Sequence, residues 1–320
     1  MRAIVKATPN MALEAREAKE FATASKAANT RRAYRAAWIE FTAFCSRRRL
    51  SPLPAEPQTV ITYITRLANS ERNKPQTIAV KLAALSFAHK TAHQLDPTAD
   101  ESVKVVMAGI RRKLGVAPEK KSAISRDDLI AMVGTLDTCT LAGKRDRALL
   151  LVGFCGAFRR SELVALDVAD VKVKGRMTIT VRRGKTDQEG QGLVKHFQDE
   201  DEIEPVSALR DWLDSAGIRS GAVFRQMDRW GNVRATRLTS QSVALVVKRA
   251  AQAADLDWRS MSGHSLRAGF VTAAYAGGAR DLEICEQTGH KDTRTLQEYY
   301  RATGQGALSA LRAATTKSNF

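Results

Sequence analysis

Residues that could carry out chemistry gather near the C-terminal end of the chain. His264 and Arg267 are three residues apart, so on a helix they would share one face. Ser262 and Gly263 stand where that helix is expected to begin, and free backbone N–H groups there would add to the charge of Arg267. This combination predicts an anion site, and phosphate is the anion that most commonly needs one.

Two phenols follow in the same stretch. Gly289-His290 predicts a turn, and residues 293–300 predict a short helix that ends in Tyr299 and Tyr300. Cations that face a phenol indicate a tyrosine nucleophile and a phosphodiester substrate. A tyrosine has an ordinary pKa of about 10 and needs a base to lose its proton, for which His264 is the candidate.

The composition favours a polyanionic partner. The chain has 320 residues, enough for two domains, with a formal net charge of +17 and an isoelectric point of about 10.0. No apolar run is long enough to span a membrane, and the N-terminus lacks the apolar core of a signal peptide. The four cysteines are scattered without a Cys-x-x-Cys pair, as expected for free thiols in a reducing cytosol, and the histidine spacing suits no common zinc site.

Residues 1–115 predict a compact helical domain rich in Ala, Arg and Lys. Asn29-Thr30 resembles the cap of a first helix, which exposes Arg31 and Arg32 in its first turn. Further helices are expected over residues 58–69, from Pro75 onward with Phe87 mostly buried, and over 100–114. Any single arginine here is more often just a solvated surface charge than a ligand contact.

Residues 116–124 predict a linker, and residues 125–320 predict a second domain, mostly helical around a small sheet. Ser125 to Asp128 would cap its first helix. Alternation over residues 177–181 predicts a strand, and residues 192–197 would return as its partner, which places Lys185 on or beside a β-hairpin. Further helices are expected over residues 144–155, 159–166, 207–214 and 240–254.

Two short motifs lead nowhere. Gly184-Lys185-Thr186 ends like a phosphate-binding loop, but that motif needs a glycine where Ile179 stands. Gly263-His264-Ser265 begins like a serine nucleophile elbow, but Arg267 occupies the place of the second glycine. The sequence therefore predicts neither nucleotide hydrolysis nor acyl transfer.

The remaining motifs resemble the tyrosine recombinase (phage integrase) family. GAFRRSELVAL is similar to the arginine box of that family, with Arg159 at the arginine and Glu162 at its accompanying acid. HSLRAGF is similar to its His-x-x-Arg block, and in TGHKDTRTLQEYY a tyrosine falls nine residues after the Gly-His histidine, which selects Tyr299 over Tyr300. The sequence departs from the family pattern at Arg160, where a small apolar residue is usual, and at Thr288, where leucine is usual.

This resemblance implies a mainly α protein shaped as a two-domain C-shaped clamp. The all-helical N-terminal half is similar to the core-binding domain of Cre-like recombinases, and the C-terminal half would be a mixed α/β catalytic domain, mostly helical with a small antiparallel sheet. The implied function is site-specific DNA recombination or integration, through a 3′-phosphotyrosyl intermediate and a Holliday junction.

A phosphodiester transition state gathers negative charge, and the sequence offers no acidic cluster to bind Mg²⁺, so arginines must stabilise that charge. Arg159 and Arg267 are the expected bidentate clamps and His290 a further hydrogen-bond donor. By resemblance Lys185 would protonate the leaving 5′ oxygen, Tyr299 would be the nucleophile, and Glu162 would orient its neighbours. We expect no metal, no ATP and no other cofactor.

The resemblance also implies partners. The expected substrate is double-stranded DNA with inverted-repeat half-sites, bound by a dimer per site and a homotetramer on two duplexes, in a bacterial or phage-type cytoplasm in association with the nucleoid. Residues 307–314 form a short helix-forming run that would dock on a neighbouring subunit or fold back on its own. The residues expected to contact DNA are Arg31, Arg32, Gln76, Lys90 and Gln241.

Two other functions stay open at this point. A type IB topoisomerase shares the chemistry and resembles the catalytic domain, although the Cre-like N-terminal half argues against it. A catalytically silent, sequence-specific DNA-binding protein would keep the basic surface but would not need Tyr299 or the two arginines.

Overall fold

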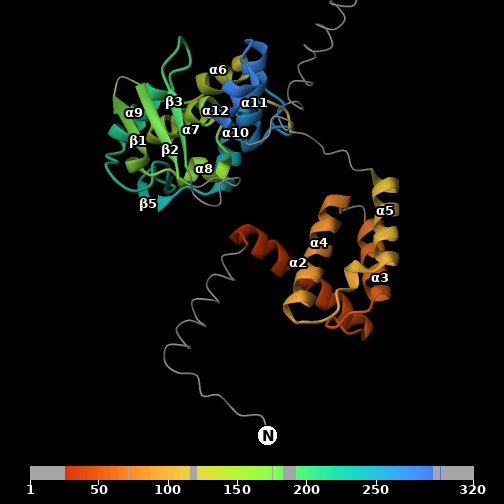
Figure 1. The fold of residues 1–320 in the computed structure, drawn as a ribbon. Helices are drawn as coiled ribbons and strands as arrows, with labels where there is room; N and C mark the ends of the chain where they lie inside the picture. The colour runs from red at the N-terminus through yellow and green to blue at the C-terminus, as the bar shows by residue number, and fades with distance from the viewer. Residues whose placement is uncertain are drawn as a thin grey trace, which may run out of the picture. The chain divides into compact units, whose positions relative to one another are not determined.

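The computed structural model describes residues 26–70, 73–115, 121–174, 176–182, 192–290 and Leu296. The chain forms two compact units, residues 1–119 and 120–320, each with its own apolar core. Both are mostly helical, and the strands of the second unit pair only antiparallel within the described residues (Figure 1). The predicted fold class is confirmed in this respect.

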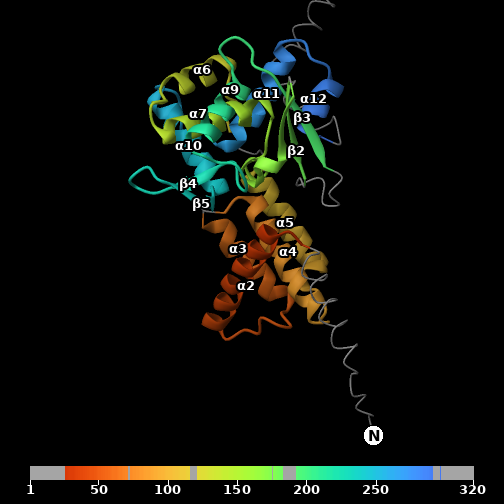
Figure 2. The same ribbon diagram turned by 90° about the vertical axis from the view of Figure 1, so that its left-hand side faces the viewer.

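In its described residues, the first unit is a group of four helices around a small core (Figure 2). They are α2 (Ala28–Arg48), α3 (Pro57–Asn69), α4 (Pro75–Thr91) and α5 (Glu101–Leu114), with a 3₁₀ turn η1 (Pro97–Ala99) before α5. Proline occupies the first position of α3 and of α4, where its missing N–H costs nothing. The Asp100 side chain caps α5 by accepting a 2.9 Å hydrogen bond from the backbone N–H of Ser102. The predicted helices over 58–69, from Pro75 and over 100–114 are confirmed within one residue at their starts.

Two details of the first unit were predicted wrongly. Helix α2 begins at Ala28 without a side-chain cap, so Asn29-Thr30 lies inside the helix. Phe87 is 42% exposed, because it faces the surface of α4 and packs beside Tyr34 at 5.7 Å between ring centroids. Lys26 covers that ring, with its ammonium 4.9 Å from the centroid.

The second unit is built around helix α7, in which every residue from 148 to 154 is buried. Its described part includes the helices α6 (Arg126–Gly134), α7 (Leu141–Cys155), α8 (Arg160–Ala165), α9 (Pro205–Ser215), α10 (Ser240–Ala253), α11 (Gly263–Ala276) and α12 (Asp281–Thr288). The helix predicted over residues 144–155 ends at Cys155 as expected, and the chain then turns through Gly156 and Ala157 toward α8. Helix α12 was not predicted from the sequence.

A three-stranded antiparallel sheet carries the hairpin that the sequence predicts. Its strands are β1 (Val171–Lys174), β2 (Arg176–Val181) and β3 (Leu193–Phe197), in the order β1-β2-β3, preceded by the 3₁₀ turn η2 (Val168–Asp170). Ile179 pairs with Val171 on one side and with Lys195 on the other. Figure 1 shows α9 beside β1 and α12 beside β3. The predicted strands over 177–181 and 192–197 are confirmed; β1 and the separate pair β4 (Arg225–Met227) and β5 (Val233–Arg237) were not predicted.

Helix α11 packs directly on the segment that leads into α6. The backbone N–H of Ile124 donates to Ser265 O at 3.2 Å, and that of Ser122 donates to Ser260 O at 3.0 Å, so residues 121–124 of the predicted linker pack on the second unit. Ser125 then caps α6 in a reciprocal box with Asp128, as predicted. A Cβ placed on Gly269 would lie 2.1 Å from Ile124 O, so the absence of a side chain at this position allows the contact.

Substituting Gly269→Ala should therefore destabilise the second unit by about 1–3 kcal/mol, because the carbonyl that the methyl would meet belongs to backbone and cannot rotate away. Urea denaturation followed by tryptophan fluorescence measures this change. Gly134→Ala is the matched control: it lies at the end of α6 in the same unit, nothing lies within 4 Å of its added Cβ, and we expect a gain of up to about 1 kcal/mol. Equal stability of the two variants would show that α11 and Ile124 do not pack as described.

Candidate active site

Arg159 stands directly before α8, where the chain leaves α7. Its backbone N–H donates to Glu162 Oε2 at 3.0 Å, and its guanidinium Nη1 donates to Glu162 Oε1 at 2.6 Å. Glu162 is only 5% exposed, so one carboxylate both caps α8 and orients the arginine. This position of Glu162 agrees with the orienting role expected from the sequence.

Arg267 lies on α11 and is 1% exposed. Its Nη1 donates to Ala157 O at 2.6 Å, two residues before Arg159, and its Nη2 donates to His290 Nε2 at 2.9 Å. The guanidinium thus links α11 to the turn before α8 and to the residue that follows α12. Arg159, Glu162, Arg267 and His290, predicted together from separate motifs, do come together in one region.

His290 is reached through a tight turn. Gly289 ends α12 in the left-handed conformation, with φ of 71°, which favours glycine, and a Cβ there would lie 2.7 Å from Leu193 Cδ2 of β3 and displace that side chain. Burial, and then the charges of Arg267 and Arg159, lower the pKa of His290 to about 4. The ring is therefore neutral at pH 7.

The hydrogen bonds of His290 define its tautomer. Because Arg267 can only donate, Nε2 must accept, and the ring proton must then lie on Nδ1. Nδ1 is 2.8 Å from Thr288 Oγ1, which accepts that proton in a hydrogen bond. Thr288, which departs from the family pattern, therefore positions the histidine two residues later.

His264 lies in the first turn of α11 with its side chain exposed, while Arg267 points inward. Its backbone N–H donates to Ser262 Oγ at 3.2 Å, so the cap serine already occupies one of the N–H groups expected to be free for an anion. Its charge contributes to the lowered pKa of His290, which places the two imidazoles in the same region.

The nucleophile and the general acid proposed from the sequence, Tyr299 and Lys185, lie outside the described residues, as do Tyr300 and the run 307–314. The strands that flank Lys185 are described, and β2 and β3 pair in the register of a hairpin. Leu296, three residues before Tyr299, is fully buried against Val271, Tyr275 and Ile284.

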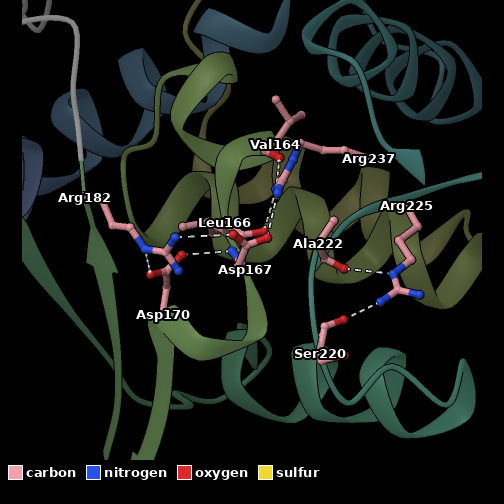
Figure 3. A network of polar contacts seen from close by, with 9 residues as sticks. All are labelled: Val164, Leu166, Asp167, Asp170, Arg182, Ser220, Ala222, Arg225 and Arg237. Atoms are coloured by element: carbon pink, nitrogen blue, oxygen red, sulfur yellow. Dashed lines mark hydrogen bonds and ion pairs between the residues drawn. The ribbon is translucent and has the colours of Figure 1, made fainter. Parts of the chain in front are cut away.

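An ion-pair network anchors the segment that follows α8 (Figure 3). Asp167 Oδ1 accepts from Arg237 Nη2 at 2.6 Å, and Asp170 Oδ1 accepts from Arg182 Nε at 2.6 Å, with a second, 3.4 Å contact from Arg182 to Asp167. Arg237 also donates to the carbonyls of Val164 and Leu166. The network joins the end of β2, where the hairpin starts, and the end of β5 to the arginine-box segment, and the sequence analysis did not find it.

A second missed residue is Lys195 on β3. Residues 193, 195 and 197 share one face of the strand. Because Leu193 and Phe197 are apolar, their spacing could have indicated that Lys195 lies on the buried face. The side chain is 0% exposed, and burial, then the charge of Arg267, lower its pKa to about 7.

The DNA-contacting residues proposed from the sequence lie on exposed helix positions. Arg31 and Arg32 are in the first turn of α2, Gln76 in that of α4 and Gln241 in that of α10. Lys90, near the end of α4, is 69% exposed and forms a 3.3 Å ion pair with Asp96, which offsets part of its charge.

Two further findings concern the described residues. Nowhere among them do three or more His, Cys, Asp or Glu side chains gather as a metal site. None of their helices combines the length and apolar character that crossing a membrane would require.

Replacing Thr288 by valine should leave the Nδ1–H of His290 without its acceptor and cost about 1 kcal/mol of stability, whereas Thr288→Ser should cost less.

In the wild type, ¹⁵N NMR of the imidazole should show a proton on Nδ1 and a neutral ring down to about pH 4. Because this pKa lies below the ordinary 6.5, the contribution of His290 to stability should be complete above about pH 6.5 and decrease as the pH falls toward 4. A proton found on Nε2 at pH 7 would contradict the hydrogen-bond assignment.

Comparison with known proteins places this site in a family. Residues 123–305 match the sequence profile of the phage integrase family. The chain is 37% identical over 289 residues to an integrase/recombinase XerD homolog of Selenomonas ruminantium, covering 88% of this chain and 84% of that protein. It is 32% identical over 178 residues to the tyrosine recombinase XerC of Myxococcus xanthus, covering 55% and 57%.

Solved structures agree on the fold. The XerH site-specific recombinase, crystallised on a palindromic difH substrate, superposes with a TM-score of 0.58 at 18% identity, over 80% of this chain and 70% of that one. A lambda integrase dimer bound to a COC′ core site gives a TM-score of 0.59 at 16% identity, over 92% and 81%. The profile match covers more than half of the chain and includes every residue of the site described above, so this chain belongs to the phage integrase family, the tyrosine site-specific recombinases.

Proposed function

We propose that this chain cuts and rejoins duplex DNA at specific sites through a covalent bond between Tyr299 and the 3′ phosphate of the cut strand. The observation that carries the proposal is the convergence of Arg159 and Arg267 with His290, with a single carboxylate, Glu162, among the described side chains bonded to them. Net positive charge in a buried region favours an anion, and guanidinium groups match the oxygens of a phosphate. The DNA-bound relatives XerH and lambda integrase support duplex DNA as the source of that phosphate.

In the proposed reaction, Tyr299 Oη attacks the phosphorus while the bond to the 5′ oxygen breaks. His264, exposed at the start of α11, takes the phenolic proton, and Lys185 gives a proton to the leaving 5′ oxygen. Arg159 and Arg267 stabilise the charge that develops on the non-bridging oxygens. The phosphotyrosine conserves the bond energy, so the 5′ hydroxyl of another strand can reverse the step and produce a Holliday junction without ATP.

His290 must gain a proton on Nε2 before it can donate a hydrogen bond from that atom to a phosphate. Its Nε2 accepts from Arg267, so a neutral ring has no proton to give a phosphate from that atom. A bound phosphate would offset the positive charges that lower the pKa of His290, and would favour a ring with protons on both nitrogens. We therefore place the donor role of His290 in the DNA complex.

Each alternative function differs from this one in a product that can be measured. A silent DNA-binding protein forms no covalent adduct, and a type IB topoisomerase relaxes supercoils without joining strands of two duplexes. The family match and the intact set of Arg159, His264, Arg267, His290 and Tyr299 favour the recombinase, acting on cytoplasmic, nucleoid-associated DNA.

The nucleophile is tested by trapping. Fragmented genomic DNA is incubated with the wild type, Tyr299→Phe and Tyr300→Phe, the reaction is stopped with detergent, and protein-bound DNA is recovered and sequenced. We expect adduct from the wild type and from Tyr300→Phe, and none from Tyr299→Phe, because only the phenol nine residues after His290 has the family spacing. An adduct lost in Tyr300→Phe and kept in Tyr299→Phe would reverse the assignment, and no adduct from the wild type would favour the silent DNA-binding protein.

The assembly is tested with the sites recovered above. We propose that residues 307–314 dock on a neighbouring subunit, so that two protomers fill the half-sites of one duplex and four join two duplexes. Deleting the residues after Gly306 should leave binding to a single half-site unchanged and abolish cooperative filling of a two-half-site duplex in a gel-shift titration. Unchanged cooperativity would show that this segment does not join subunits.

A further inference from the structure

Lys195 is a buried cation to which the proposed reaction gives no role. Its Nζ donates a hydrogen bond to the backbone carbonyl of Gln287, in the last turn of α12, and lies 5.1 Å from the centroid of the Phe158 ring. Neither partner has a negative charge, and within the described part of the chain no carboxylate forms an ion pair with this ammonium. A charge so placed is costly, because a carbonyl and a ring replace water poorly.

The groups around Lys195 make that cost larger. Those that act on it electrostatically come from three elements and comprise Arg159 and Glu162 at α8, Arg267 on α11 and His290 after α12. Across the sheet, β2 offers the buried apolar residues Met177, Ile179 and Val181. Glu162 already binds Arg159 at 2.6 Å, so among the residues that the structure describes the cluster holds more cations than anions.

We propose that Lys195 is a positioning residue that takes up a proton from solvent when a phosphate group binds at Arg159 and Arg267. The inference rests on the proposed function, since the phosphate is that of the DNA strand. Without the anion, a neutral amine limits the repulsion among the cations. With the anion present, the ammonium adds a third positive charge behind the two guanidinium groups, and that charge is balanced.

The hydrogen bond to Gln287 allows this change without movement. A neutral amine still carries two N–H bonds and an ammonium three, so both forms can donate to the carbonyl of Gln287. The end of α12, and with it Gly289 and His290, can therefore stay in place while the charge of the site changes. Lys195 would therefore gain its charge when the phosphate binds without displacing His290.

The lowered pKa of Lys195, about 7, agrees with the proposal and sets the range in which to test it. The folded pKa lies below the ordinary value of 10.5, so the buried lysine costs stability at neutral pH, and this cost disappears as the pH rises above 10.5. Lys195→Met should therefore fold and have a higher melting temperature than the wild type at pH 7, which makes it a usable control.

The direct test follows the Lys195 side chain in the full chain labelled with ¹³C at the lysine Cε, with sulfate as the probe because its charge is constant over the range. The Lys195 signal is the one missing from Lys195→Met. We expect a titration midpoint of about 7 without sulfate, and of about 8 or higher with saturating sulfate. In Arg267→Met, sulfate should no longer move the midpoint.

Three results would overturn the proposal. The first is a midpoint above about 9 without sulfate. The second is an unchanged midpoint at sulfate concentrations that shift the His290 ring signals. The third is the lack of any sulfate effect on either residue, which would show that the cluster is not an anion site. None of these depends on covalent adduct, so an adduct without the shift refutes this inference alone, and a shift without adduct refutes the proposed recombinase alone.

The effect on the reaction is measured with a recovered DNA site. Lys195→Met should slow adduct formation by about tenfold, less than the two to three orders of magnitude expected for losing a direct donor to the transition state. The wild-type rate should begin to fall near the midpoint at which Lys195 loses its proton in the complex. In Lys195→Met that step should be missing, and only the decrease expected at high pH from deprotonation of the proposed general acid, Lys185, should remain. A purely structural role for Lys195 predicts the same shape of pH profile for both proteins, and that result would also overturn the proposal.

Discussion

The second unit depends on one buried cation, Arg267. A guanidinium that is 1% exposed must have its N–H groups hydrogen-bonded, and Arg267 donates to the carbonyl of Ala157 and to the ring of His290. These two contacts fix α11 against the turn before α8 and against the residue after α12. Ala157, Arg267 and His290 are distant in the sequence, and the hydrogen bonds that the buried guanidinium requires hold them together.

The same charge shapes the chemistry of its neighbours. After burial, it is the largest influence that lowers the pKa of His290, and it determines the tautomer of that ring. It is likewise the largest influence on the pKa of Lys195 after burial. The carboxylate of Glu162 offsets part of the positive charge of the site, and it forms its ion pair with Arg159. Two acidic residues of the segment after α8, Asp167 and Asp170, form ion pairs with Arg237 and Arg182 outside the cluster. Counted over the described part of the chain, the site has an excess of positive charge that suits a phosphate.

Much of this could be predicted from the sequence where the signal is local. Alternation over residues 177–181 predicted β2, and the box from Ser125 to Asp128 predicted α6, because each pattern depends only on neighbours in the chain. The shared site of Arg159, Arg267 and His290 was predicted instead from the resemblance to the recombinase family, because no local pattern joins residues so far apart in the sequence. The start of α2, the exposure of Phe87, and the short strands β1, β4 and β5 were missed or wrong, because tertiary packing decides them. Lys195 was missed because nothing next to it in sequence shows that Gln287, Phe158 and Arg267 close over it. The roles of Lys185 and Tyr299 stay predictions.

Gln287 illustrates how such a site limits evolution. Its side-chain Nε2 donates to the carbonyls of Cys155 at 2.8 Å and His196 at 3.1 Å, and its own carbonyl accepts from Lys195, so one residue links α7, β3 and α12. Glutamine and glutamate codons differ by a single nucleotide, which makes this exchange easily accessible to mutation. A carboxylate of the same shape would, however, face two carbonyl oxygens with nothing to donate. The exchange would therefore leave the carbonyls of Cys155 and His196 without this donor and weaken the contact of α12 with α7 and β3.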